Sequence, residues 1–295
     1  MTHQAMQRPR PAIASTLPGD MRITPCTPTI GAEITGVDLS QPLSADQQQA
    51  IHDAIAQHQV IFFRDQHLDH EAHQRFGLYF GELAIHSGVS GLADYPEVVA
   101  IHADENSTSV AGESWHSDLS CNVEPPMGSI LYLQTVPPVG GDTLFASMYA
   151  AYDSLSEKMK AYIEGLEAVH DGEMIYRKYT NDPNKKFPVT AHPMVIVHPV
   201  TGRKALFVNA QYVTHIVGMD REESRAILSY LFHHCMDPAF QVRFRWQANS
   251  VAFWDNRCTQ HHAVWDYFPQ VRSGFRVTVQ GHKPIASGTT MEPRS

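Results

Sequence analysis

One histidine and two arginines near the C-terminal end of the chain have types and a spacing suited to binding a small molecule. Arg272 and Arg276 follow His261 after a predicted turn. The arginines are separated by an even number of positions, so in a strand of period two both side chains leave the same face. Guanidinium groups stay charged and bind carboxylates in a bidentate way. If His261 ligates a metal, this stretch predicts a receptor for one or two organic anions beside it.

The remaining ligands of such a metal are expected upstream, in the segment GESWHSDLS, which contains His116 and Asp118. In an extended chain both side chains project to one face. Two imidazoles and one carboxylate on one face of an octahedron leave three positions open, which is typical of non-haem Fe(II) oxygenases. The His-x-Asp spacing does not decide the matter alone, because it occurs at two other places, His67 with Asp69 and His102 with Asp104.

Both rival pairs have structural interpretations. Asp69 is expected to cap the helix that begins DHEAHQRF, and His102 closes the apolar run EVVAIHAD, which predicts a strand end. Cys258 lies close to His261 in sequence and is interpreted as a small core residue, because thiolate suits zinc better than a dioxygen-activating iron. His116 and Asp118 therefore remain the favoured partners of His261.

Two further motifs accompany the WHSD sequence: GGDTLF at 140–145 and WDNRCTQH at 254–261. Together with the two arginines that follow, they resemble the TauD/TfdA family of Fe(II)- and 2-oxoglutarate-dependent dioxygenases, and the likeness extends over nearly the whole chain. The resemblance implies Fe(II), 2-oxoglutarate as cosubstrate and O2. Carried over position by position, it assigns the catalytic iron ligands to His116, Asp118 and His261.

The same resemblance assigns the binding of the two organic molecules. Thr143 and Arg272 would hold the distal carboxylate of 2-oxoglutarate, while Arg276 would face the anionic group of the substrate. His86 matches a histidine that contacts the sulfonate in taurine dioxygenases. Val89 stands where those enzymes have a tyrosine, so we expect a substrate less polar than taurine.

The implied reaction is hydroxylation of a small organic anion next to a heteroatom, of the sulfonate or alkyl sulfate type, with release of succinate and CO2. An aryloxyalkanoate substrate is the alternative within the family. Outside it, a zinc hydrolase could use the same three ligands, but Thr143 and the two arginines would then lack a joint purpose. A non-catalytic 2-oxoglutarate sensor would keep both sites without turnover.

Composition limits the other classes of function. The 295 residues are 43% hydrophobic and 18% charged, with a formal net charge of −9. A nucleic-acid surface would need a basic stripe, so no nucleic-acid partner is expected. Apolar runs fall short of the ~20 residues of a membrane span, which predicts no membrane partner. Four cysteines without a C-x-x-C motif favour a reduced, cytoplasmic protein, and we expect a homo-oligomer, either a dimer or a tetramer.

The elements that must position these residues are β-rich. We expect a tail over residues 1–20 and a single domain over 21–295, with a lid at about 171–192, where periodicity is low. Helices are predicted at 44–57, with Ser44 and Gln47 forming a capping box, at 156–169, and at 220–235. The fold class is β-rich α+β. Its topology, a double-stranded β-helix or jelly roll with flanking helices, is implied by the resemblance.

Overall fold

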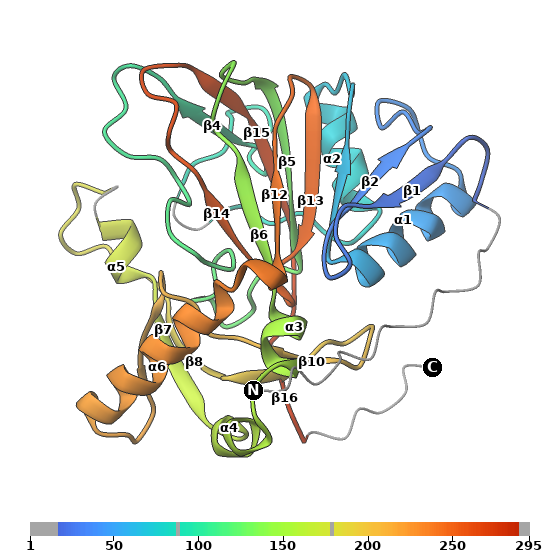
Figure 1. The fold of residues 1–295 in the computed structure, drawn as a ribbon. Coiled ribbons are helices and arrows are strands. Elements are labelled where there is room, and N and C mark those ends of the chain that lie inside the picture. The colour runs from blue at the N-terminus through green and yellow to red at the C-terminus, as the bar shows by residue number, and fades with distance from the viewer. Residues whose placement is uncertain (1–16, 87–88, 178–179, 289–295) are drawn as a thin grey trace.

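The computed structural model describes residues 17–86, 89–177 and 180–288, so most of the tail predicted for residues 1–20 lies outside the described part. Two β-sheets form the centre of the molecule, and the smaller sheet lies against one face of the larger (Figure 1). Helices pack on the opposite face of the large sheet and at one end. This is the predicted jelly-roll core with flanking helices.

The large sheet has seven strands, all antiparallel to their neighbours except at one parallel pair. Alternate residues of its central strands face opposite ways, so Phe62 points to the small sheet and Phe63 to the helices. Both faces are therefore buried, which explains the nearly continuous apolar sequence VIFF. The strands, in spatial order, are β1 (Arg22–Pro25), β2 (Ala32–Thr35), β3 (Val60–Phe63), β13 (Ser250–Asp255), β5 (Gly128–Thr135), β15 (Arg272–Val279) and β4 (Val99–Ala103).

The small sheet has the order β12 (Gln241–Phe244), β6 (Thr143–Ser147) and β14 (Thr259–Ala263). An apolar layer fills the space between the sheets, where Phe62 of β3 stacks on Phe244 of β12 with ring centroids 3.9 Å apart. Strands β14 and β15, which carry His261 and the two arginines, therefore belong to facing sheets.

Helices α1 (Ala45–His58) and α2 (His70–Leu78) cover the outer face of the large sheet (Figure 1). The capping box predicted for α1 is confirmed, since the Ser44 hydroxyl accepts from the backbone of Gln47 and the Gln47 side chain accepts from the backbone of Ser44. Asp69 caps α2, as predicted. Such caps satisfy backbone N–H groups that a helix start leaves without partners.

The C-terminal half adds two three-stranded sheets and further helices at one end of the core (Figure 1). The helix predicted over 156–169 is wrong in its second half. It ends at Ile163, Gly165 adopts a φ of +81°, and residues from Glu167 pair as a strand. The elements are β11 (Val213–Ile216), β7 (Glu167–Asp171), β8 (Val189–Pro193), β10 (Lys204–Leu206), β9 (Val195–Val197), β16 (Ile285–Ala286), α3 (Met148–Asp153), α4 (Glu157–Ile163), α5 (Glu173–Tyr176), α6 (Arg221–Cys235) and the 3₁₀ turn η2 (Pro238–Phe240).

The segment predicted as a lid, about 171–192, is bounded by secondary structure. It begins at the end of β7, includes the short helix α5, and ends within β8, which pairs with β7. The Arg177 guanidinium donates to the carbonyls of Asp182 and Lys185, at 3.0 and 2.6 Å.

Among the described residues, none of the helices has the length and apolarity needed to cross a membrane.

Candidate functional site

A cavity of about 360 Å³ opens between the sheets. Its size lies in the range of small-molecule sites in proteins. The walls come from β4, β5, β6, β14 and β15, from the loop before β5, and from α5. The cavity brings together all seven predicted site residues, which are His86, His116, Asp118, Thr143, His261, Arg272 and Arg276.

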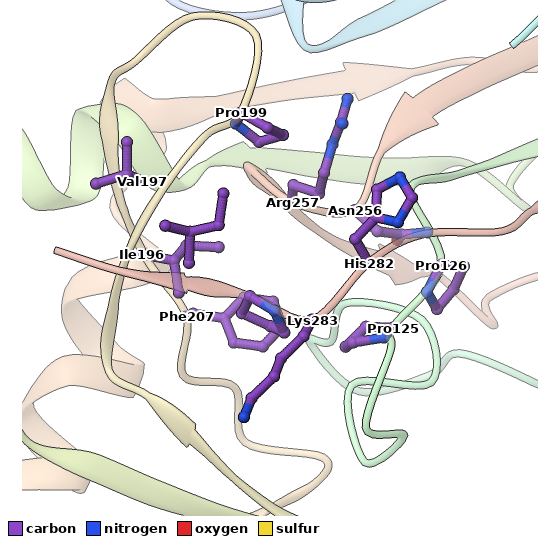
Figure 2. A pocket seen from close by; sticks show the side chains of 12 residues that line it. Pro125, Pro126, Ile196, Val197, Pro199, Phe207, Asn256, Arg257, His282 and Lys283 are labelled. Atoms are coloured by element: carbon purple, nitrogen blue, oxygen red, sulfur yellow. The ribbon is translucent and has the colours of Figure 1, made fainter. Parts of the chain in front are cut away.

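A second hollow of about 40 Å³ lies near Arg257 and shares no lining residue with the large cavity. Figure 2 shows Ile196 and Phe207 on one side of it, with Asn256 and His282 on the other. A water molecule needs roughly 10–15 Å³ by this measure. The hollow therefore has room for a few waters only, and the chemistry belongs to the large cavity.

Backbone pairing sets the two candidate histidine ligands side by side. His116 and His261 form an isolated β-bridge, with N–H to carbonyl distances of 3.1 and 2.8 Å in the two directions. Their ring centroids lie 4.1 Å apart. The Oδ1 atom of Asp118 lies 3.6 Å from His116 Nε2 and 3.9 Å from His261 Nε2. Three potential ligand atoms thus converge on one point.

The carboxylate of Asp118 is held by residues that the sequence did not reveal. Its Oδ2 atom accepts a hydrogen bond from the Ser129 hydroxyl at 2.7 Å, and its backbone N–H donates to Asn256 Oδ1 at 3.1 Å. The Asn256 amide also donates to Ser129 at 3.2 Å. Oδ1 is left facing the histidines, which suits a ligand whose orientation is fixed by its outer hydrogen bonds.

The protonation states of these groups fit a divalent metal. Burial alone would raise the pKa of Asp118, but the nearby Arg276 guanidinium holds it well below its usual range. Burial lowers the pKa of His261 far below its ordinary value. His116 donates from Nδ1 to the Ser114 carbonyl at 2.7 Å, and its Nε2 faces Asp118. Two imidazoles and one carboxylate form the donor set expected for non-haem Fe(II).

The rival pairs do not make comparable sites. Among residues 17–86, 89–177 and 180–288, neither His67 with Asp69 nor His102 with Asp104 has a third ligand nearby. His198, Asp255 and Cys258 do form a second cluster. There, however, both carboxylate oxygens of Asp255 accept from Arg257, at 2.9 and 2.6 Å. That guanidinium already supplies the positive charge, so we interpret the cluster as a structural ion pair and Cys258 as a buried core residue.

Arg272 and Thr143 form one end of the cavity. The Arg272 guanidinium donates to the Gly141 carbonyl at 3.0 Å and to the Thr143 hydroxyl at 3.3 Å. Thr143 Oγ1 also accepts from the Trp246 indole N–H at 3.0 Å, so its own O–H remains able to donate. Arg272 is 6% exposed, and among the described residues no carboxylate lies within ion-pair distance of it. Burying a cation without an acidic partner is unfavourable, and a bound anion would remove that cost.

Arg276 and His86 line another part of the same cavity. A bulge between Ser273 and Gly274 interrupts the register of β15, yet both arginines of this strand reach the cavity, as the even spacing predicted. Arg276 Nη1 lies 3.0 Å from Asp118 Oδ1, and its buried Nε has no hydrogen-bond partner in the described part of the chain. This arginine therefore keeps a donor for a ligand.

His86 is buried at the cavity wall, and its Nδ1 accepts from the Val89 backbone N–H at 3.1 Å. The neutral ring then carries its proton on Nε2. Burial is the main cause that lowers the pKa of His86 to about 4, and the Arg276 charge acts in the same direction. At neutral pH His86 is thus a neutral hydrogen-bond donor.

Sequence reasoning missed several residues around the site, namely Ser129, Tyr176, Asn256, Tyr212 and Trp246. Asn256 could have been found, because it stands inside the WDNR motif. The others carry no local signal, since their positions depend on how distant strands are paired.

Comparisons with known proteins identify the family of the chain. Residues 22–278 match the family "Taurine catabolism dioxygenase TauD, TfdA family". An alpha-ketoglutarate-dependent sulfate ester dioxygenase of Pseudomonas putida is 36% identical, with 90% of this chain and 91% of the relative covered. The solved structure of a taurine dioxygenase from Burkholderia xenovorans is 36% identical, with a TM-score of 0.80 and coverage of 91% and 94%.

A more distant relative is an alpha-ketoglutarate-dependent 2,4-dichlorophenoxyacetate dioxygenase of a Burkholderia species. It is 28% identical, and the match covers 90% of this chain and 93% of the relative. The family match spans most of the chain, and the sulfate ester dioxygenase matches along nearly its full length. This chain belongs to the TauD/TfdA family of dioxygenases.

Proposed function

We propose that the protein is an Fe(II)- and 2-oxoglutarate-dependent dioxygenase that hydroxylates a small organic anion on the carbon next to its heteroatom. The substrate is of the sulfonate or alkyl sulfate type, and the products include succinate and CO2. The observation that carries the proposal is the buried guanidinium of Arg272, which has no acidic partner among the described residues and lies in the same cavity as the cluster of His116, Asp118 and His261. A metal site alone would not require such a cation.

Each group in the cavity has a distinct task in this proposal. Fe(II) with 2-oxoglutarate and O2 supplies the oxidant that removes a hydrogen atom from an aliphatic C–H bond. Arg272 and Thr143 hold the distal carboxylate of 2-oxoglutarate, and Arg276 with His86 holds the anionic head group of the substrate. Apolar side chains of the cavity walls, Ile101 among them, exclude water from the reacting carbon.

The products follow from where the new hydroxyl group is placed. A carbon that carries both a hydroxyl group and a sulfur or oxygen leaving group is unstable and decomposes to a carbonyl compound. Hydroxylation next to the heteroatom therefore cleaves a C–S bond and releases sulfite, or a C–O bond and releases sulfate. Both oxygen atoms of O2 are accounted for, one in succinate and one in the hydroxylated product.

The chemistry of the walls favours a substrate less polar than taurine. Val89 lines the cavity where taurine dioxygenases have a tyrosine, and neighbouring wall residues such as Val110 and Ile175 are apolar. An amine at the far end of the substrate would lose hydration where it meets these apolar side chains, at a cost in free energy. We expect alkyl or aryl sulfonates and sulfate esters to be preferred.

A substrate panel tests the proposal. Succinate release is measured with taurine, alkyl sulfonates, alkyl sulfates and aryloxyalkanoates, in the wild type and in Arg276→Ala. Turnover of a sulfonate or sulfate that is strongly reduced in Arg276→Ala supports the proposal. A cation or neutral molecule as best substrate would contradict it, and taurine ranking first would contradict the argument from Val89.

The other candidate functions give different results in the same experiments. A zinc hydrolase would show no visible absorption band when Fe(II) and 2-oxoglutarate are added anaerobically. A 2-oxoglutarate sensor would show the band but no succinate release with any compound of the panel. An aryloxyalkanoate dioxygenase would show turnover of the phenoxy acids in preference to sulfates, and its named relative is the more distant one.

We also propose that residues 21–295 act as one domain in which the segment about 171–192 is a lid. Ile175 and Tyr176 of α5 line the cavity, which supports a covering role. A homo-oligomer, dimer or tetramer, is proposed as well, and light scattering after gel filtration tests it.

A cytoplasmic location is supported by the four cysteines, all of which are unpaired, and cell fractionation tests it.

A further inference from the structure

Two tyrosines whose hydroxyl groups contact each other lie in the wall of the large cavity. Tyr176 comes from α5, and Tyr212 immediately precedes β11. Their hydroxyl oxygens are 2.8 Å apart, and the residues are 6% and 2% exposed. Burial raises the pKa of both phenols above the ordinary value. At neutral pH both are uncharged hydroxyl groups.

The pair spans the distance between the candidate head-group residues and the candidate metal ligands. The ring of Tyr176 packs edge-on against His86, with centroids 6.0 Å apart. The ring of Tyr212 lies 6.5 Å from that of His116. A substrate that places its anionic group at His86 and Arg276, and its adjacent carbon at the metal, lies in the cavity that Tyr176 and Tyr212 line.

Tyr212 is held in place by hydrogen bonds of its backbone. Its N–H donates to Asn209 Oδ1 at 3.0 Å, and its carbonyl accepts from the Asp171 N–H at 2.8 Å. The Asn209 amide in turn donates to the Ser120 hydroxyl at 3.0 Å, close in sequence to Asp118. The pair is therefore fixed relative to the segment that carries the metal ligands, as a preorganised binding group should be.

The hydroxyl pair has one more O–H proton than its own hydrogen bond uses. Two hydroxyl groups have two O–H protons, and the hydrogen bond between Tyr176 and Tyr212 uses one of them. The second proton can turn toward the cavity and donate to an anion. A hydrogen bond to a charged acceptor is stronger than one between neutral groups, so an anionic substrate gains most from it.

We propose that the Tyr176–Tyr212 pair donates a hydrogen bond to the anionic head group of the substrate and thereby selects its geometry. This inference rests on the proposed function. Arg276, His86 and the tyrosine pair form three donors, which match the three terminal oxygens of a sulfonate or sulfate. The three terminal oxygens of such a group point in three directions, whereas the acceptor lone pairs of a carboxylate lie in one plane, so donors placed around the head group match the tetrahedral anion better. The pair is thus a specificity determinant for tetrahedral anions over planar ones.

The test compares two anions of similar length, hexyl sulfate and heptanoate. Their dissociation constants are measured by titration calorimetry on the enzyme loaded anaerobically with Fe(II) and 2-oxoglutarate, for the wild type, Tyr176→Phe and Tyr212→Phe. Loss of a hydrogen bond to a charged group predicts that hexyl sulfate binds about tenfold to a hundredfold more weakly in at least one variant. The heptanoate constant should change less than about twofold, within the scatter of a neutral contact.

Two other results would overturn the inference. Unchanged binding of hexyl sulfate in both variants would remove the pair from the head-group site. If the binding of both anions is weakened equally, the hydroxyls only fix α5 over the cavity and do not select the anion. Because calorimetry needs no turnover, this result is independent of succinate release by the wild type, which tests the proposed function alone.

Tyr132→Phe is the matched control for folding. It also removes a hydroxyl, one that donates to Asn249 Oδ1 at 2.9 Å, but Tyr132 does not line the cavity. Its thermal midpoint shows what the loss of one such hydrogen bond costs the fold. The thermal midpoints of Tyr176→Phe and Tyr212→Phe should fall by no more than that of Tyr132→Phe. The control should also bind hexyl sulfate with the same dissociation constant as the wild type.

Discussion

Replacing Arg272 by methionine tests whether the cavity is built around the carboxylate of 2-oxoglutarate. The methionine side chain fills similar space without the charge. Loss of one partner of a desolvated charge pair costs about 2–5 kcal/mol, so the KM for 2-oxoglutarate should rise by about 30-fold to several thousand-fold. Arg272 is buried and has no acidic partner among the described residues, so a bound carboxylate would form its main ion pair.

The same substitution should affect the ligand-free protein much less. It removes two hydrogen bonds, to Gly141 and Thr143, but it also removes the unfavourable burial of an unpaired cation. A ligand present at a hundred times its Kd stabilises a fold by about 2.7 kcal/mol. We therefore expect that adding 2-oxoglutarate, with metal present throughout, raises the thermal midpoint of the wild type and leaves that of Arg272→Met nearly unchanged.

Arg243→Met is the control for this experiment. Arg243 pairs with Asp142, the residue before Thr143, at 2.6 Å, but its side chain is 54% exposed. Exposed ion pairs contribute only about 0–1 kcal/mol, so its KM for 2-oxoglutarate should remain that of the wild type. An unchanged KM in Arg272→Met, together with a retained thermal shift on adding 2-oxoglutarate, would refute the assignment of this end of the cavity.

Two other predictions concern the metal and the pH dependence of stability. Changing His116, Asp118 or His261 to alanine should abolish both Fe(II) binding and succinate release. Asp69→Ala and Asp104→Ala should retain both, and the opposite pattern would reject this ligand set. Burial lowers the pKa of His73 to about 4, so between about pH 6.5 and 4 the unfolded state binds a proton that the folded state does not. The free energy of unfolding should fall with decreasing pH in this window, by up to about 1.4 kcal/mol per pH unit for this residue, and urea titrations of His73→Gln should give a smaller slope.

The sequence was sufficient where function or local structure depends on residues close together in the chain. The N-caps at Ser44 and Asp69 are local, and both were predicted correctly. The helix prediction was wrong after residue 163 because the residues after Gly165 form β7, which pairs with β8 and β11. An amphipathic pattern in the sequence does not show which distant strands a segment will pair with.

In the candidate site, too, some residues could be predicted from the sequence and others could not. The histidines and arginines could be proposed from their types and spacing, because ligand chemistry restricts which residues can serve. The hydrogen bond from Ser129 to Asp118 could not, since it requires β5 to lie beside the loop that carries Asp118. The contact between Arg276 and Asp118 was also not predicted, because it depends on the positions of both side chains in the folded cavity.

The charges buried in the cavity bear on the identity of the substrate. Asp118 is ionised beside Arg276, Arg272 lies in the same cavity, and His86 and His261 are neutral at pH 7 because burial lowers their pKa values. These side chains together carry one excess positive charge, while the further acid of the cavity lining, Glu113, is exposed to solvent. A divalent metal and the dianion 2-oxoglutarate cancel each other, so that excess persists after both have bound. A buried charge without a counter-ion is unfavourable, and a monoanion is the substrate that removes it, whereas a cation would double the imbalance.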